Sequence, residues 1–247
     1  MNSKIHELRN LKTKFIGKTL LQIFLITVLF VGFTKAVTAA TISKNFAVKE
    51  FSKLKTGSAF HVEFIHSNEN KVDIEIDEDM ADKLFVENSG DELIIKLKDY
   101  GGNNIHTMKA KVYGNTLSEL TISGAAHFKS DYTFTEKNID INSSGASKVD
   151  ITVNTENLNM EISGASKVIT KGNADKQIIE ISGASTYNGK ECKSANITIE
   201  SSGASKASIN CTDTLNVEAS GASHITYTSV PKNINKETSG ASSVELK

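Results

Sequence analysis

Residues 158–166 read Leu158-Asn-Met-Glu-Ile-Ser-Gly-Ala-Ser166. Apolar and polar residues alternate strictly as far as Ile162, which is the period of a β-strand with one buried face. The Ser-Gly-Ala tripeptide that follows contains only small residues, and glycine accepts backbone angles that other residues resist. This stretch therefore predicts a strand that ends in a tight corner.

The Ser-Gly-Ala tripeptide occurs seven times, at intervals of 18 to 21 residues. Its glycines are Gly124, Gly145, Gly164, Gly183, Gly203, Gly221 and Gly240. A repeat of this length, built from strands without a helix between copies, is typical of a parallel β-solenoid in which each turn stacks on the previous one. We therefore expect an all-β fold: a parallel β-helix, right-handed by preference, whose seven Ser-Gly-Ala turns occupy residues 118–247.

Aligning the copies on the glycine reveals further columns. The position four residues before the glycine is apolar in six copies and is expected to face the core; it holds Leu120, Ile141, Met160, Ile179, Ile199, Val217 and then Lys236. The polar residue in the last copy fits a terminal turn on which nothing stacks. The serines around each glycine are expected to bind local backbone and the next turn's serine, which is a mainly architectural role.

The chain before the repeats divides into two segments. Residues 1–40 combine a basic start, an apolar stretch over 20–33 and small residues over 36–40, which predicts a signal peptide cleaved after Ala39 or Ala40. An uncleaved N-terminal anchor is the alternative. Residues 41–117 lack the tripeptide but alternate as strands do, and we expect an N-terminal β module that caps the solenoid or forms its irregular first turns.

The charge is distributed unevenly along the chain. Residues 1–40 hold six of the 28 basic and one of the 29 acidic residues, which leaves 22 basic against 28 acidic residues in 41–247. The only arginine is Arg9. Because Lys and Arg neutralise phosphates, this acidic, arginine-free remainder argues against nucleic acid as a partner, and we expect no membrane insertion after signal cleavage.

The motifs resemble a known family. The features are an export signal, a Phe51-x-x-Leu54 opening, a Gly90-Asp-Glu-Leu-Ile turn-and-strand, and Leu117-Ser-Glu-Leu-Thr-Ile-Ser-Gly-Ala leading into repeated Ser-Gly-Ala-Ser. Together they are similar to the auto-transporter adhesin head GIN domain family, common in Bacteroidetes, over residues 46–247. The resemblance implies an exported β-helical protein with an adhesive role and brings no catalytic residues or cofactor.

Two cysteines are candidates for a disulfide. Cys192 lies nine residues after Gly183, and Cys211 lies eight residues after Gly203. These nearly equivalent positions in consecutive turns would place their Cα atoms about 5 Å apart, within disulfide range. Two buried free thiols are the alternative.

One column of the repeat is acidic. Three residues before the glycine stand Glu161, Glu180, Glu200, Glu218 and Glu237, in five consecutive turns. Hard carboxylate oxygens in a column suggest a Ca²⁺ ladder. A solvated face of mixed charge is the competing interpretation, because Lys148, Lys167 and Lys206 stand three residues after their glycines. His127 and His224 occupy the same column as these lysines and predict a surface role.

Three functions compete. The leading hypothesis is a non-enzymatic, exported solenoid of the periplasm or cell surface that binds a glycan, matrix or envelope polymer through its repeated polar faces. The second is a purely structural periplasmic envelope protein. The third is a carbohydrate-active β-helix enzyme, which the lack of Arg in residues 41–247, the absence of Trp and the regular spacing of the acids disfavour.

Overall fold

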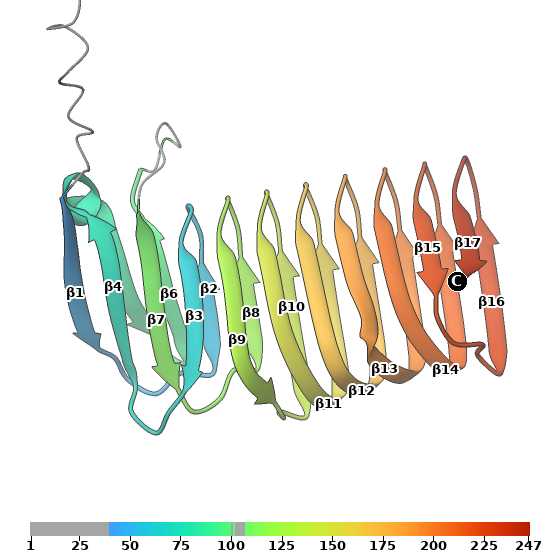
Figure 1. The fold of residues 1–247 in the computed structure, drawn as a ribbon, viewed down its shortest axis with the longest axis horizontal. Helices are drawn as coiled ribbons and strands as arrows, with labels where there is room; N and C mark the ends of the chain where they lie inside the picture. Colours follow the sequence, from blue (N-terminus) through green and yellow to red (C-terminus); the bar gives the residue numbers. More distant parts are fainter. Residues whose placement is uncertain (1–39, 100, 102–106) are drawn as a thin grey trace, which may run out of the picture. The chain divides into compact units, whose positions relative to one another are not determined.

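The computed structural model describes residues 40–99, 101 and 107–247 (Figure 1), so the predicted signal peptide lies outside the described residues except for Ala40. Residues 40–247 form one compact unit. Its elements are β1 (Thr41–Ala47), β2 (Lys53–Thr56), β3 (His61–His66), β4 (Lys71–Asp77), the 3-10 helix η1 (Glu78–Lys83), β5 (Leu84–Ser89), β6 (Glu92–Leu97), β7 (Met108–Gly114), β8 (Glu119–Ile122), β9 (His127–Phe134), β10 (Asn138–Ser143), β11 (Lys148–Ile162), β12 (Lys167–Ile181), β13 (Thr186–Ser201), β14 (Lys206–Ala219), β15 (His224–Tyr227), β16 (Asn233–Thr238) and β17 (Ser243–Leu246).

The strands wind into the predicted parallel β-solenoid, whose turns stand side by side in Figure 1. Each turn adds one strand segment to each of two ladders. The first ladder runs β1-β4-β7-β3-β9 and continues through the first halves of β11–β14 to β15 and β17. The second runs β5-β6-β2-β8-β10 and continues through the second halves of β11–β14 to β16. The two ladders meet at the Ser-Gly-Ala corners.

The corner has the geometry that the tripeptide predicted. Gly164 has φ +75°, and a Cβ built there would lie 2.5 Å from the carbonyl oxygen of Gly145 in the previous turn. The same oxygen accepts a hydrogen bond from the Ala165 amide at 2.7 Å. At Gly164, both the backbone angle and the close approach of the previous turn therefore favour glycine.

The core is a set of stacked apolar columns. The register places Leu120, Ile141 and Met160 in neighbouring strands, and the column continues through Ile179, Ile199 and Val217. All six side chains are buried. Burial of apolar area is the main term that stabilises such a stack, because each turn covers the one before it.

The region before the first tripeptide contributes both a solenoid turn and an end structure. Strands β2 and β3 form a turn that lies between β6–β7 and β8–β9, and its corner, Gly57-Ser58-Ala59, stacks on the corner of Gly124. Ser58 has φ +61°, and its carbonyl oxygen accepts a hydrogen bond from the Ala125 amide at 2.7 Å. The pairings β1–β4, β4–β7 and β5–β6 are antiparallel and close this end of the coil.

Candidate functional site

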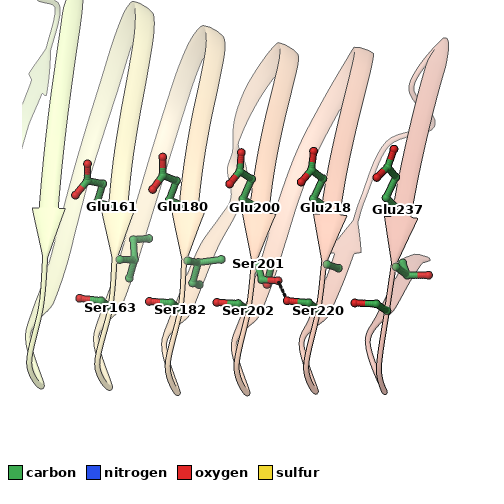
Figure 2. A pocket seen from close by; sticks show the side chains of 15 residues that line it. Glu161, Ser163, Glu180, Ser182, Glu200, Ser201, Ser202, Glu218, Ser220 and Glu237 are labelled. Atoms are coloured by element: carbon green, nitrogen blue, oxygen red, sulfur yellow. Dashed lines mark hydrogen bonds between the residues drawn. The ribbon is translucent and has the colours of Figure 1, made fainter.

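The acidic column predicted from the repeat is a continuous row in the structure. Glu161 pairs in register with Glu180, Glu180 with Glu200, Glu200 with Glu218, and Glu218 with Glu237. All five side chains are exposed. Figure 2 shows them pointing the same way, one from each turn of the second ladder.

A groove runs beside this row. Its volume is about 560 Å³. It is lined by the five glutamates, by the residue that directly follows each glutamate, and by a row of serines. The serines directly precede the corner glycines; they are Ser163, Ser182, Ser202, Ser220 and Ser239. Figure 2 shows the two rows running parallel along the turns. We call this feature the glutamate groove.

The carboxylates of the glutamate groove have no ion-pair or hydrogen-bond partner within the described part of the chain. They are spread one to a turn and do not converge on a single point (Figure 2). Among residues 40–99, 101 and 107–247, no group of three or more His, Cys, Asp or Glu is placed to hold a metal ion. The groove therefore offers a line of separate hydrogen-bond acceptors along the coil.

The basic column lies on the first ladder. His127 pairs with Lys148 and Lys148 with Lys167, and Lys206 pairs with His224 further along. Burial is the main cause that lowers the pKa of His127, and the neighbouring Lys148 lowers it further. The lysines and glutamates of one repeat thus face outward from different ladders on either side of a corner.

The predicted disulfide is absent, because Cys192 and Cys211 are both free thiols. The register explains why the two cysteines are not opposite each other. Five residue steps from Asn188 to Lys193 on β13 face only two steps from Ser208 to Asn210 on β14. This bulge contains Cys192, and Ser194 takes the place opposite Cys211. Burial raises the pKa of both thiols, that of Cys192 to about 11.

A buried polar cluster lies in the core beside this bulge. The Tyr187 hydroxyl donates to Gln177 Oε1 at 2.7 Å and lies 2.8 Å from the Thr170 hydroxyl. Gln177 Nε2 in turn donates to the Ser194 hydroxyl at 2.6 Å. A Cβ at Gly189 would lie 2.3 Å from the tyrosine oxygen, so the ring fits only beside glycine. The cluster satisfies its own hydrogen bonds within the core.

Sequence reasoning predicted the serines only as corner residues and missed their place in the groove. Ser163 directly follows the end of β11 and lies two residues after Glu161, the spacing at which residues of an extended chain share a face. The alternation that placed Met160 and Ile162 in the core therefore also predicts that Glu161 and Ser163 lie together on the outer face.

The fold and its surface columns define the class of the molecule: a parallel β-solenoid repeat protein with polar columns along its outer faces. The chain belongs to the family described as "Putative auto-transporter adhesin, head GIN domain", whose model matches residues 50–231. This match confirms the family that the sequence motifs indicated.

Solved structures show the same fold. A putative adhesin from Bacteroides fragilis matches with a TM-score of 0.78 and 19% identity, and a putative adhesin from Parabacteroides distasonis with 0.69 and 18%. A protein from Parabacteroides distasonis described as a putative lipid binding protein matches with 0.64 and 20%. Each alignment covers 85% of this chain and 98% of the other. A search of curated proteins found no match.

The described residues contain no helix that is long and apolar enough to cross a membrane.

Proposed function

We propose that this protein is an exported, non-enzymatic, adhesin-like solenoid that binds an extended polysaccharide of the cell envelope or extracellular matrix along the glutamate groove. The observation that carries the proposal is the row of five unpaired carboxylates, in register beside a row of serines. Membership in the adhesin family supports the same role.

The chemistry of the groove suits a polymer with hydroxyl or amine groups. Ionised carboxylates accept hydrogen bonds, and serine hydroxyls donate and accept them. Neighbouring turns of the coil are about 4.8 Å apart, so the same pair of groups is offered repeatedly along the groove. Many weak contacts of this kind add up through multivalency, which gives useful affinity without a deep pocket.

The arrangement of the acids supports a non-enzymatic role. A glycoside hydrolase places two carboxyl groups on opposite sides of one scissile bond. The glutamates here stand on one side of the groove in a single row (Figure 2). Residues 41–247 also contain no arginine to serve a lyase mechanism.

Binding is tested with the purified protein on arrays of glycans and matrix proteins. The variant Glu180→Gln, Glu200→Gln, Glu218→Gln should lose most of the signal, because it removes the three central carboxylates of the row. The matched control Glu78→Gln, Glu87→Gln, Glu245→Gln makes the same change in charge outside the groove and should bind as the unmodified protein does. Equal binding by both variants would exclude the groove as the site.

Export is tested by cell fractionation and by adding protease to intact cells. The proposal expects the protein outside the cytoplasm and accessible to external protease. Complete protection from protease, together with flat array signals, would favour the structural role in the periplasmic envelope.

A further inference from the structure

Both ends of the solenoid present strand edges that could pair with another chain. Within residues 40–99, 101 and 107–247, strand β1 pairs only with β4, and β5 pairs only with β6, at the N-terminal end. At the C-terminal end, the only strand of the described part of the chain that pairs with β16 is β14, and the only one that pairs with β17 is β15. The free backbone groups of an edge strand are a template for a further strand.

The C-terminal end also carries exposed apolar side chains. Among the described residues, four large hydrophobic side chains are exposed, and three of them, Val230, Ile234 and Leu246, belong to the last turn. Val244 is only half-buried against the core. Free edges and apolar side chains at the same end are the features that promote end-to-end association between copies.

One lysine lies across the C-terminal end. Lys236 pairs in register with Val217, which is buried, so its side chain starts on the core side of β16. Its Nζ donates to the Tyr227 hydroxyl at 3.0 Å and to the Val244 carbonyl at 3.3 Å, and it lies 4.6 Å from the centre of the Tyr227 ring. A further strand stacked on this turn would bury the ammonium group.

The N-terminal end also has a lysine on the core side of its terminal strand. Lys44 on β1 stands opposite Ile74 of β4, and opposed residues of an antiparallel pair point to the same side of the sheet. Because Ile74 is buried, Lys44 also starts on the core side, between Ile42 and Phe46. Its Nζ donates to the Ala81 carbonyl at 3.2 Å.

We propose that Lys44 and Lys236 block the two ends of the solenoid against pairing with a second copy of this chain. Burial of an ammonium group without a carboxylate partner is strongly unfavourable, and inward-pointing charges on edge strands are a known means of preventing edge-to-edge pairing. Each lysine is held in place by a hydrogen bond to a backbone carbonyl of its own end. The surfaces beneath them are latent interfaces for another copy.

The test replaces each lysine with methionine, which has similar length and no charge. Light scattering coupled to size-exclusion chromatography should find monomers for the unmodified protein. Lys236→Met should form dimers through its C-terminal end, with self-association at least tenfold tighter. The double variant with Lys44→Met should form longer end-to-end assemblies, visible by electron microscopy.

Lys206→Met is the matched control, because Lys206 is exposed in a central turn and points outward. It should remain monomeric. A monomeric Lys236→Met with an unchanged circular dichroism spectrum would overturn the proposal, as would equal assembly of Lys206→Met or end-to-end assembly of the unmodified protein. If the Lys44 variant does not fold, Lys236→Met alone decides the outcome.

Discussion

Replacement of Gly164 by alanine should destabilise the solenoid through two separate effects. Its φ of +75° lies in the left-handed region, where a Cβ costs about 1–2 kcal/mol. The new Cβ would also lie 2.5 Å from the Gly145 carbonyl oxygen, which accepts the Ala165 amide. Moving the turns apart weakens that hydrogen bond, worth about 0.5–1.5 kcal/mol. The free energy of unfolding should therefore fall by about 2–3 kcal/mol.

Gly90→Ala separates the two effects. Gly90 has φ +64°, but a Cβ there would meet no atom within 4 Å. This variant should show the backbone penalty alone, about 1–2 kcal/mol. The measurement is urea denaturation followed by circular dichroism for both variants and the unmodified protein. A loss for Gly164→Ala no larger than that for Gly90→Ala would refute the argument that close stacking requires glycine at the corner.

Three further predictions concern Tyr187, the two cysteines and the half-buried His127. Tyr187→Phe should lower the free energy of unfolding by about 1–3 kcal/mol in urea, because Gln177 loses its hydrogen-bond donor. Cys192 and Cys211 should resist a thiol reagent at mildly alkaline pH and react fully in denaturant, since burial raises both pKa values; rapid native reaction would contradict their burial. The lowered pKa of His127 means that the unfolded chain binds its proton more tightly, so stability should decline as pH falls below 6.5. His127→Asn should reduce that decline in pH-dependent thermal unfolding.

The repeat predicted the solenoid because its period constrains every turn in the same way. The column that contains Met160 faces the core in each copy from Leu120 to Val217, as the alternation required. The acidic and basic columns also followed directly, because residues at equal distances from the glycine fall in register where no bulge intervenes. Local periodicity is sufficient for such features, since each turn contacts mainly its neighbours.

The first corner was not recognisable from spacing. Ser58 stacks on Gly124 although 66 residues separate them in the sequence. The chain forms strands β4 to β7 between these two turns, and the turns are nevertheless neighbours in space. Serine in place of glycine further conceals the match. The pairing depends on long-range contacts that leave no period in the sequence.

The disulfide prediction was wrong for a related reason. The prediction counted residues from the corner glycine and assumed that the turns of 20 and 18 residues stay in register as far as the cysteines. The surplus residues instead form the bulge in β13 that contains Cys192. The buried cluster of Tyr187 and Gln177 lies beside it. A polar core cluster and a local bulge are decided by packing in three dimensions, which equal spacing cannot indicate.

The glutamate row is not required by the coil that displays it. Thr121 and Asn142 occupy the same column in the first two repeats and pair there in the same register. Amide ladders are available to this fold, since Asn157 donates to Asn138 at 2.8 Å. Carboxylates about 5 Å apart instead repel each other by about 0.8 kcal/mol per neighbouring pair in water before screening by salt. The fold therefore does not account for a self-repelling row over five turns, and this is the physical reason why we propose a binding role for the row.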